Sequence, residues 1–113
     1  MRHEELAKQN YRDAGAVSTP AWRVTMYFYA AVHAVNHGKF KTNHAPASYR
    51  HDDRRDWIRA NLSMGDAADY KALEDLSWIA RYEAKQHPLD TDVAREARGF
   101  ADSVFRATGV AIP

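Results

Sequence analysis

The chain contains no cysteine, only four prolines and five glycines in 113 residues, and no long uninterrupted hydrophobic run. Without cysteine it can form neither a disulfide framework nor a thiolate site. The most apolar stretch, 24–35, is interrupted by His33 and is too short to span a bilayer. No apolar run follows the charged N-terminal residues, so we expect no signal peptide. These absences predict a cytoplasmic protein without a membrane partner.

The length and the composition predict one globular domain over residues 1–113. Hydrophobic residues make up 45% and charged residues 27%, which is typical of a folded protein. The net charge is only +1, so the chain as a whole is not a polyelectrolyte binder. A chain of this length buries a modest core, which is consistent with burial shared with a second subunit.

The positive charge is concentrated between residues 39 and 59. Six cations minus three anions give this stretch a net charge of +3, and the remainder a net charge of −2. The cations are Lys39, Lys41, Arg50, Arg54, Arg55 and Arg59, and the anions are Asp52, Asp53 and Asp56. Such a stretch can bind phosphate groups, but it is also typical of a solvated face or an ion-pair network.

Apolar residues recur every three or four positions along most of the chain, which predicts an all-α protein. No segment alternates apolar and polar residues, so we expect no sheet. The pattern fits an antiparallel bundle of four main helices plus a short helix. The expected helices are 4–16, a second from Pro20 to a stop at Gly38, 49–62, a fourth from a cap at Asp66 to about Gln86, and a last one that ends at Gly109. The other expected N-caps are Ser18 or Thr19, Ser48, and Asp90 or Thr91.

The second helix is apolar on nearly all sides, which predicts a central, buried position. One stripe consists of Trp22, Met26, Tyr29 and His33, and another of Val24, Phe28, Ala31 and Val35. Aromatic side chains such as Trp22, Tyr29 and Tyr82 could stack nucleobases if they were exposed. Aromatics at helical spacing usually belong to the core, however, so we expect these three to be buried.

Three motifs follow one another in a fixed order: YFYAAVHAVNHG (27–38), SYRHDDRR (48–55) and YKALEDLSWIARY (70–82). Together they resemble the HEPN superfamily, in particular its small bacterial members, and the resemblance covers residues 22–82. It implies a compact helical bundle that is often a homodimer and needs no cofactor. Many HEPN proteins are metal-independent ribonucleases of toxin–antitoxin, phage-defence or CRISPR systems, and others are inactive RNA-, nucleotide- or protein-binding modules. The implied partners are a second copy, RNA, and a cognate antitoxin or nucleotidyltransferase.

Active HEPN members carry an Arg-x(4–6)-His motif, and one match lies here, from Arg81 to His87 with five residues between them. The resemblance makes these two the expected catalytic pair. Histidine transfers protons near neutral pH, and the arginine fork pairs with two phosphate oxygens, so the pair suits attack of an RNA 2′-hydroxyl on phosphorus. The residue after the arginine is usually Asn, Asp or His, whereas here it is Tyr82. The other interpretation is an inactive module in which Arg81 interacts with the last helical carbonyls.

A second candidate site is His51-x-x-Arg54, whose side chains need partners such as His33, Asn36 or Glu74. Either these residues form a structural polar cluster that fixes helix register, or they bind RNA phosphate. The phosphate interpretation also includes Arg50, Arg55 and Tyr82.

A metal site is the third interpretation. His33 and His37 lie four residues apart on one helix face, a spacing that can bind a metal, with His44 and His51 near in sequence. No carboxylate completes the pattern on this helix. A histidine within an apolar stripe is more often a core residue, so we expect no bound metal.

Overall fold

The computed structural model describes residues 2–43, 51–83, 85–86 and 88–113, and all its regular structure there is helical. The all-α prediction is therefore confirmed. The helices are α1 (His3–Ala16), α2 (Pro20–Asn43), α3 (His51–Asn61), α4 (Met64–Trp78), the π-helical turn η1 (Ile79–Glu83) and α5 (Thr91–Thr108). Within the described part, no helix combines the length and the apolar character needed to cross a bilayer.

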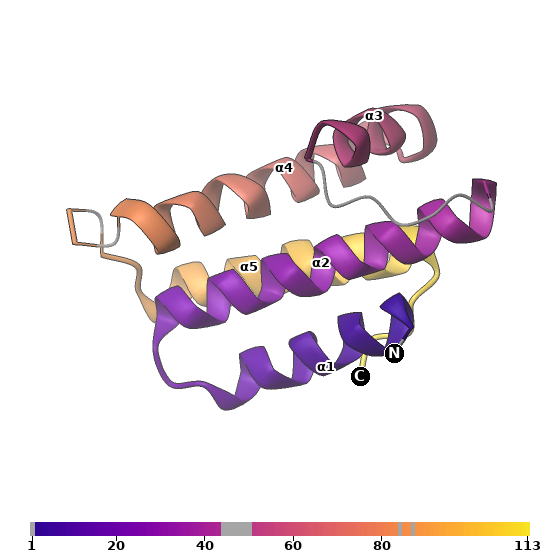
Figure 1. Cartoon of the computed structure of the whole chain (residues 1–113). Helices are drawn as coiled ribbons and strands as arrows, with labels where there is room; N and C mark the ends of the chain where they lie inside the picture. Colours follow the sequence, from indigo (N-terminus) through magenta and orange to yellow (C-terminus); the bar gives the residue numbers. More distant parts are fainter. Residues whose placement is uncertain (1, 44–50, 84, 87) are drawn as a thin grey trace.

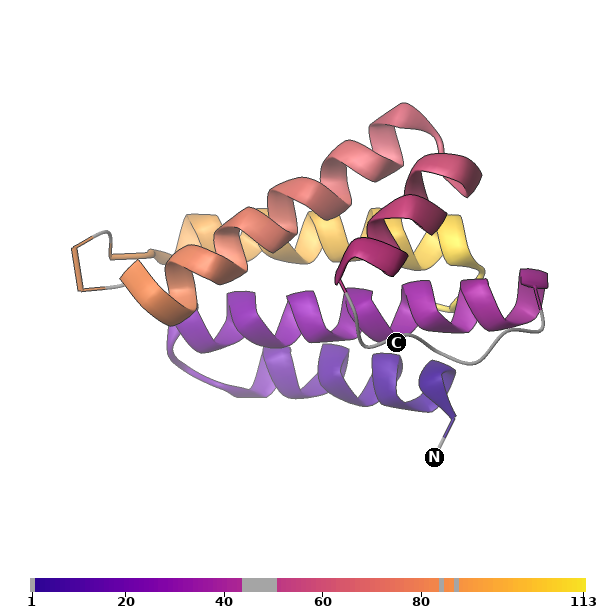
Figure 2. The ribbon, with the colours of Figure 1, turned by 45° about the horizontal axis from the view of Figure 1, so that its top comes forward.

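Helix α2 is the centre of the structure. It contacts α1, α4 and α5, while α4 also packs on α5 (Figures 1 and 2). Helices α2 and α5 run in the same direction, and α1 and α4 run in the opposite direction (Figure 1). The short helix α3 lies beside the C-terminal part of α2 and leads into α4 (Figure 2). Among the described residues of α2, Trp22 and Tyr29 stay exposed on one face of this helix.

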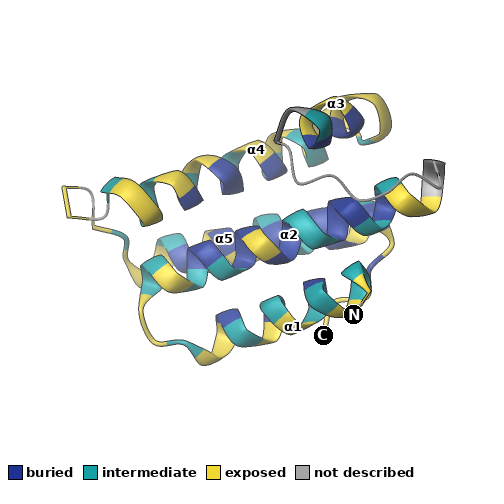
Figure 3. Cartoon of the chain, viewed as in Figure 1, coloured by how far each residue is buried: buried dark blue, intermediate teal, exposed yellow. Residues whose placement is uncertain are grey.

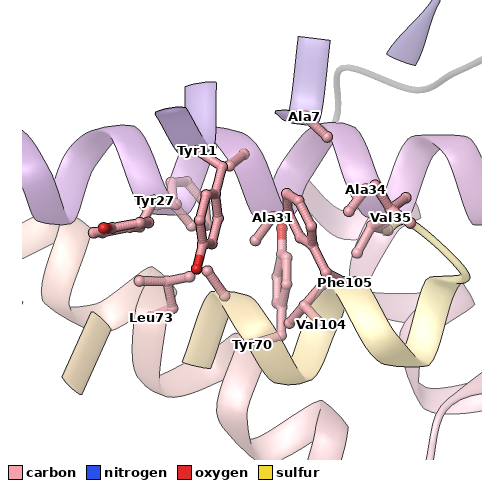
Figure 4. Packing of buried hydrophobic residues seen from close by; sticks show 14 of the residues in the cluster. Ala7, Tyr11, Tyr27, Ala31, Ala34, Val35, Tyr70, Leu73, Val104 and Phe105 are labelled. Atoms are coloured by element: carbon pink, nitrogen blue, oxygen red, sulfur yellow. The ribbon is translucent and has the colours of Figure 1, made fainter. Parts of the chain in front are cut away.

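The core lies where α1, α4 and α5 meet α2 (Figure 3). The predicted stripe of Val24, Phe28, Ala31 and Val35 is fully buried. Figure 4 shows the partners of this stripe, which are Ala7 and Tyr11 of α1, Tyr70 and Leu73 of α4, and Val104 and Phe105 of α5. Small residues such as Ala7 and Ala34 allow α1 to approach α2 closely.

Both ends of α5 form as its sequence predicts. The carboxylate of Asp90 accepts a hydrogen bond from the backbone N–H of Val93 at 2.9 Å, so Asp90 is the N-cap. Gly109 ends the helix at φ 78°, a left-handed conformation that favours glycine.

The predicted stop of α2 at Gly38 is wrong, because α2 continues to Asn43. A Cβ atom at Gly38 would lie 2.9 Å from Cη2 of Trp57 and 3.4 Å from Cβ of Thr108. Glycine is therefore needed for close packing against α3 and α5, and it does not end the helix. The predicted loop accordingly begins later than Lys39, and the predicted cap at Ser48 lies outside the described residues.

The predicted start and end of the fourth helix are also wrong. The hydroxyl of Ser63, not the carboxylate of Asp66, accepts the capping hydrogen bond, which the backbone N–H of Asp66 donates at 3.1 Å. The α-helical geometry ends at Trp78 and changes to the π-helical turn η1, instead of continuing to Gln86. This change places Arg81 within the π-helical turn.

Candidate nucleic-acid interface

Arg81 is exposed on the π-helical turn η1 and is held by its own helix. Its Nε donates to the backbone oxygen of Ser77 at 3.2 Å, and its Nη2 lies 3.4 Å from the Ser77 hydroxyl oxygen. Ser77 is fully buried, and its hydroxyl donates to the backbone oxygen of Glu74 at 2.8 Å. Single π-helical turns occur frequently at functional sites. These bonds therefore fix the base of the guanidinium group while its outer side stays open to solvent.

Aromatic rings surround the Arg81 guanidinium. Its Cζ lies 5.3 Å from the ring centroid of Tyr82 and 5.8 Å from that of Phe28, which is within the range of cation–π attraction. The rings of Tyr82 and Trp78 are in contact, with centroids 4.4 Å apart. The guanidinium therefore lies near one buried ring, Phe28, and one exposed ring, Tyr82.

A hollow of about 240 Å³ joins this region of α4 and η1 to α2. Its lining consists of Ala21, Trp22, Thr25, Ala80 and Arg81. Trp22, Trp78, Arg81 and Tyr82 thus form a continuous exposed surface, which we call the aromatic–arginine surface.

The expectation that Trp22, Tyr29 and Tyr82 belong to the core is wrong. Their exposed fractions are 60%, 40% and 62%. Trp22 and Tyr29 lie two turns apart on one face of α2, which the packing against α1, α4 and α5 leaves exposed, and Tyr82 lies on the π-helical turn η1. Trp78 was not singled out by the sequence analysis, although its i, i+4 spacing to Tyr82 was a signal that both share a face.

The predicted polar cluster is distributed over α2, α3 and α4. Arg54 is buried, with 4% of its surface exposed, and so is Asn36, with 1% exposed. Burial raises the pKa of the Tyr70 hydroxyl, and the positive charge of Arg54 opposes this rise. Both amide atoms of Asn36 lack a hydrogen-bond partner among the described residues. Arg54 and Asn36 thus lie in the interior instead of on a phosphate-binding surface.

Two cations of the basic stretch 39–59 form ion pairs in the part that the structure describes. Nη2 of Arg55 lies 2.6 Å from the Glu74 carboxylate, and Nη2 of Arg59 lies 2.5 Å from that of Asp56. These pairs partly neutralise the positive charge that the sequence places here. Arg50 and the side chain of His51 lie outside the described residues.

His33 and His37 each have a partner on α1. Nδ1 of His33 lies 2.9 Å from Nδ1 of His3, and the two rings are stacked. Burial, followed by the charge of His3, lowers the pKa of His33, and burial followed by His37 lowers the pKa of His3. Nε2 of His37 lies 3.6 Å from a carboxylate oxygen of Glu4. No group of three potential metal ligands occurs in the part of the chain that the structure describes, so the geometry lends no support to a site at His33 and His37.

Of the predicted catalytic pair, the structure thus describes Arg81, with Tyr82 beside it, whereas His87 lies outside the described residues. The features that sequence reasoning missed are Trp78 and the contact between His3 and His33. No local pattern gives a signal for the contact, because the two histidines are thirty residues apart. None of the family models, curated proteins or solved structures compared with the chain matches it.

Proposed function

We propose that this chain is an HEPN-like, cytoplasmic RNA-processing domain in which Arg81 binds the RNA phosphate. In this proposal it is a metal-independent endoribonuclease of a toxin–antitoxin or phage-defence system. It acts as a homodimer, with a cognate antitoxin or nucleotidyltransferase as its partner. The proposal is supported by the HEPN-like order of the sequence motifs and by one structural observation, the exposed and anchored guanidinium of Arg81.

The environment of Arg81 suits an anionic ligand. Its hydrogen bonds go to the neutral backbone and hydroxyl oxygens of Ser77, and no carboxylate of a described residue forms an ion pair with it. Arginine keeps its charge at every physiological pH and can pair with two phosphate oxygens. An exposed arginine without an acidic partner is therefore suited to a phosphate group.

The proposed reaction uses Arg81 together with His87. A histidine removes the proton from the RNA 2′-hydroxyl, whose oxygen attacks the adjacent phosphorus. The bond from phosphorus to the 5′-oxygen breaks, and a protonated group gives this oxygen its proton. The products are a 2′,3′-cyclic phosphate and a free 5′-hydroxyl. Arg81 stabilises the additional negative charge on the phosphorane oxygens. In a two-fold dimer, two such pairs meet in one groove.

A binding-only module is the second candidate, and Tyr82 favours it. The position after the arginine carries a polar side chain in active members of the resembled family, whereas Tyr82 is an exposed ring in contact with Trp78. A large exposed ring at this position is suited to contact a ligand, as in a binding module. In this alternative, Arg81 binds the RNA phosphate and no bond is cleaved.

The test is an RNA cleavage assay in EDTA with the wild type, Arg81→Ala and His87→Ala. If the proposed reaction is correct, we expect the wild type to produce 2′,3′-cyclic phosphate ends. The cleavage rate of each variant should be lower by a factor of about 100 or more. Arg95→Ala is the matched control, because Arg95 is an exposed arginine on α5 that pairs with Asp92.

Binding of the same RNA by the same variants separates the two candidates. RNA that the wild type retards but does not cleave would favour the binding-only module. Cleavage that is equal in the wild type and Arg81→Ala would remove Arg81 from the mechanism. Absence of both binding and cleavage in the wild type would contradict the proposed function.

A further inference from the structure

The exposed aromatic side chains are unevenly distributed over the molecule. The large hydrophobic residues that are exposed in the described part are Trp22, Tyr29, Phe40, Met64, Trp78, Tyr82 and Ile112. All the Trp and Tyr side chains of this set lie on the first half of α2 or on α4 and η1. The third tryptophan of the chain, Trp57, is buried with 7% exposed. Exposed tryptophan at the aromatic–arginine surface is thus a local property that the core does not require.

The charge of this surface is positive. Its one charged residue is Arg81, whose Cζ lies 5.3 Å from the ring centroid of Tyr82 and which forms no ion pair with a described residue. A ligand complementary to this surface has flat aromatic faces for the rings and an anionic group, a short linker away from those faces, for the Arg81 guanidinium. Nucleotides combine these two features.

The size of the surface favours a narrow ligand over a second protein subunit. The exposed parts of its three rings, Trp22, Trp78 and Tyr82, amount to about 400 Å². A stable protein–protein interface buries about 800 Å² on each partner, roughly twice this area. The hollow between Trp22 and Arg81, about 240 Å³, is smaller than the roughly 300–1,000 Å³ of pockets that enclose drug-sized ligands. It accommodates one ring at a time, as a strand of successive bases requires.

We propose that the aromatic–arginine surface binds single-stranded RNA, with unpaired bases stacked on Trp22, Trp78 and Tyr82 and a neighbouring phosphate paired with Arg81. This inference rests on the proposed function and names the form of RNA that the site takes. Bases within a duplex are stacked on one another and hide their faces, so double-stranded RNA lacks the surface that these rings recognise. Because any base can stack on an aromatic ring, we expect the surface to prefer single-stranded over double-stranded RNA and to show no preference for a base sequence.

The test measures binding of a fluorescently labelled 12-nucleotide RNA by anisotropy, as a single strand and annealed to its complement, in EDTA and with His87→Ala protein so that the RNA stays intact. We expect Trp22→Ala and Tyr82→Ala each to weaken single-strand binding about 5- to 100-fold. Tyr82→Phe keeps the ring and should bind within about twofold of its parent. Phe40→Ala is the matched control, because Phe40 is 55% exposed on α2 but lies outside the surface.

The outcomes distinguish this inference from the proposal that it extends. If the parent protein binds the single strand and Trp22→Ala and Tyr82→Ala bind equally well, the stacking surface is refuted while RNA binding stands. Equal affinity for the duplex and the single strand would refute the stated preference. If the parent binds no RNA, both proposals fail. If Trp22→Ala changes the sedimentation coefficient of the RNA-free protein, the Trp22 ring packs against a second subunit instead of a base, and the inference is overturned. Far-ultraviolet circular dichroism and thermal unfolding check that each variant is folded.

Discussion

Replacement of Gly38 by alanine tests how α2, α3 and α5 pack. In an exposed helix interior, alanine is more favourable than glycine by about 1 kcal/mol. At Gly38, however, the new Cβ would lie 2.9 Å from Cη2 of Trp57 and 3.4 Å from Cβ of Thr108. Trp57 is a buried, rigid ring that cannot move aside freely, and overpacking of a core typically costs about 1–3 kcal/mol. We therefore expect Gly38→Ala to lower the free energy of unfolding by about 1 kcal/mol.

Gly99→Ala is the matched control, because Gly99 lies within α5 and no atom approaches within 4 Å of its added Cβ. This variant should raise the free energy of unfolding by about 0.5–1 kcal/mol. The two substitutions therefore differ by about 2 kcal/mol, which separates their melting temperatures by about 8 °C in a chain of this size. Urea unfolding and thermal melts followed by circular dichroism measure both values.

A double variant separates the contact with Trp57 from other effects at Gly38. Leucine at position 57 lacks the atom that would clash, so Gly38→Ala should become neutral or stabilising in a Trp57→Leu background. An equal loss of stability in both backgrounds, or stabilisation by Gly38→Ala in the wild type, would refute the packing described here.

Two other predictions concern contacts of α1. Because the pKa values of His3 and His33 are lowered, chiefly by burial, the fold favours their neutral forms. Their contribution to stability is complete above about pH 6.5, the unfolded value, and is lost as the pH falls below it toward the lowered pKa values. The free energy of unfolding should therefore fall more between pH 7 and 5 in the wild type than in His3→Gln, and equal slopes would contradict this. The Tyr11 hydroxyl donates to Asp102 at 2.6 Å and accepts from Arg98 at 3.0 Å, so Tyr11→Phe should destabilise the protein by about 1–3 kcal/mol in urea unfolding. A decrease in the free energy of unfolding of less than about 0.5 kcal/mol would show that these hydrogen bonds do not stabilise the packing of α1 on α5.

The helix ends that depend on neighbouring residues could be predicted from the sequence. Asp90 and Gly109 act within one turn of the helix that they bound, so local patterns reveal them. The role of Gly38 could not be predicted, because the sequence does not distinguish a glycine that ends a helix from one that packs against a tryptophan ring. Only the position of Trp57, nineteen residues later, distinguishes them.

The covered face of α2 could not be predicted for a related reason. Both of its stripes are apolar, and periodicity does not tell which of them the other helices cover. The structure shows that Val24 and Phe28 face the core, whereas Trp22 and Tyr29 face solvent. This difference determines the candidate site, since it exposes the tryptophan that shares a hollow with Arg81.

Adjacent residues of α3 show that the sequence also does not tell which charged side chains are exposed. Arg54 is buried and Arg55 is exposed and paired with Glu74, although both belong to one basic run in the sequence. Adjacent residues of a helix point about 100° apart, so one of the two can face the interior while the other faces solvent. The net charge of the run therefore does not tell which of its cations are exposed.

The salt dependence of RNA binding tests the role of Arg81 most directly. For single-stranded RNA, each phosphate contact contributes about −0.7 to the slope of log K against log salt concentration. The account predicts that the slope of Arg81→Ala is shallower than that of the wild type by about this amount, while Arg95→Ala keeps the wild-type slope. Identical slopes for the wild type and Arg81→Ala would show that Arg81 contacts no phosphate and would contradict the account.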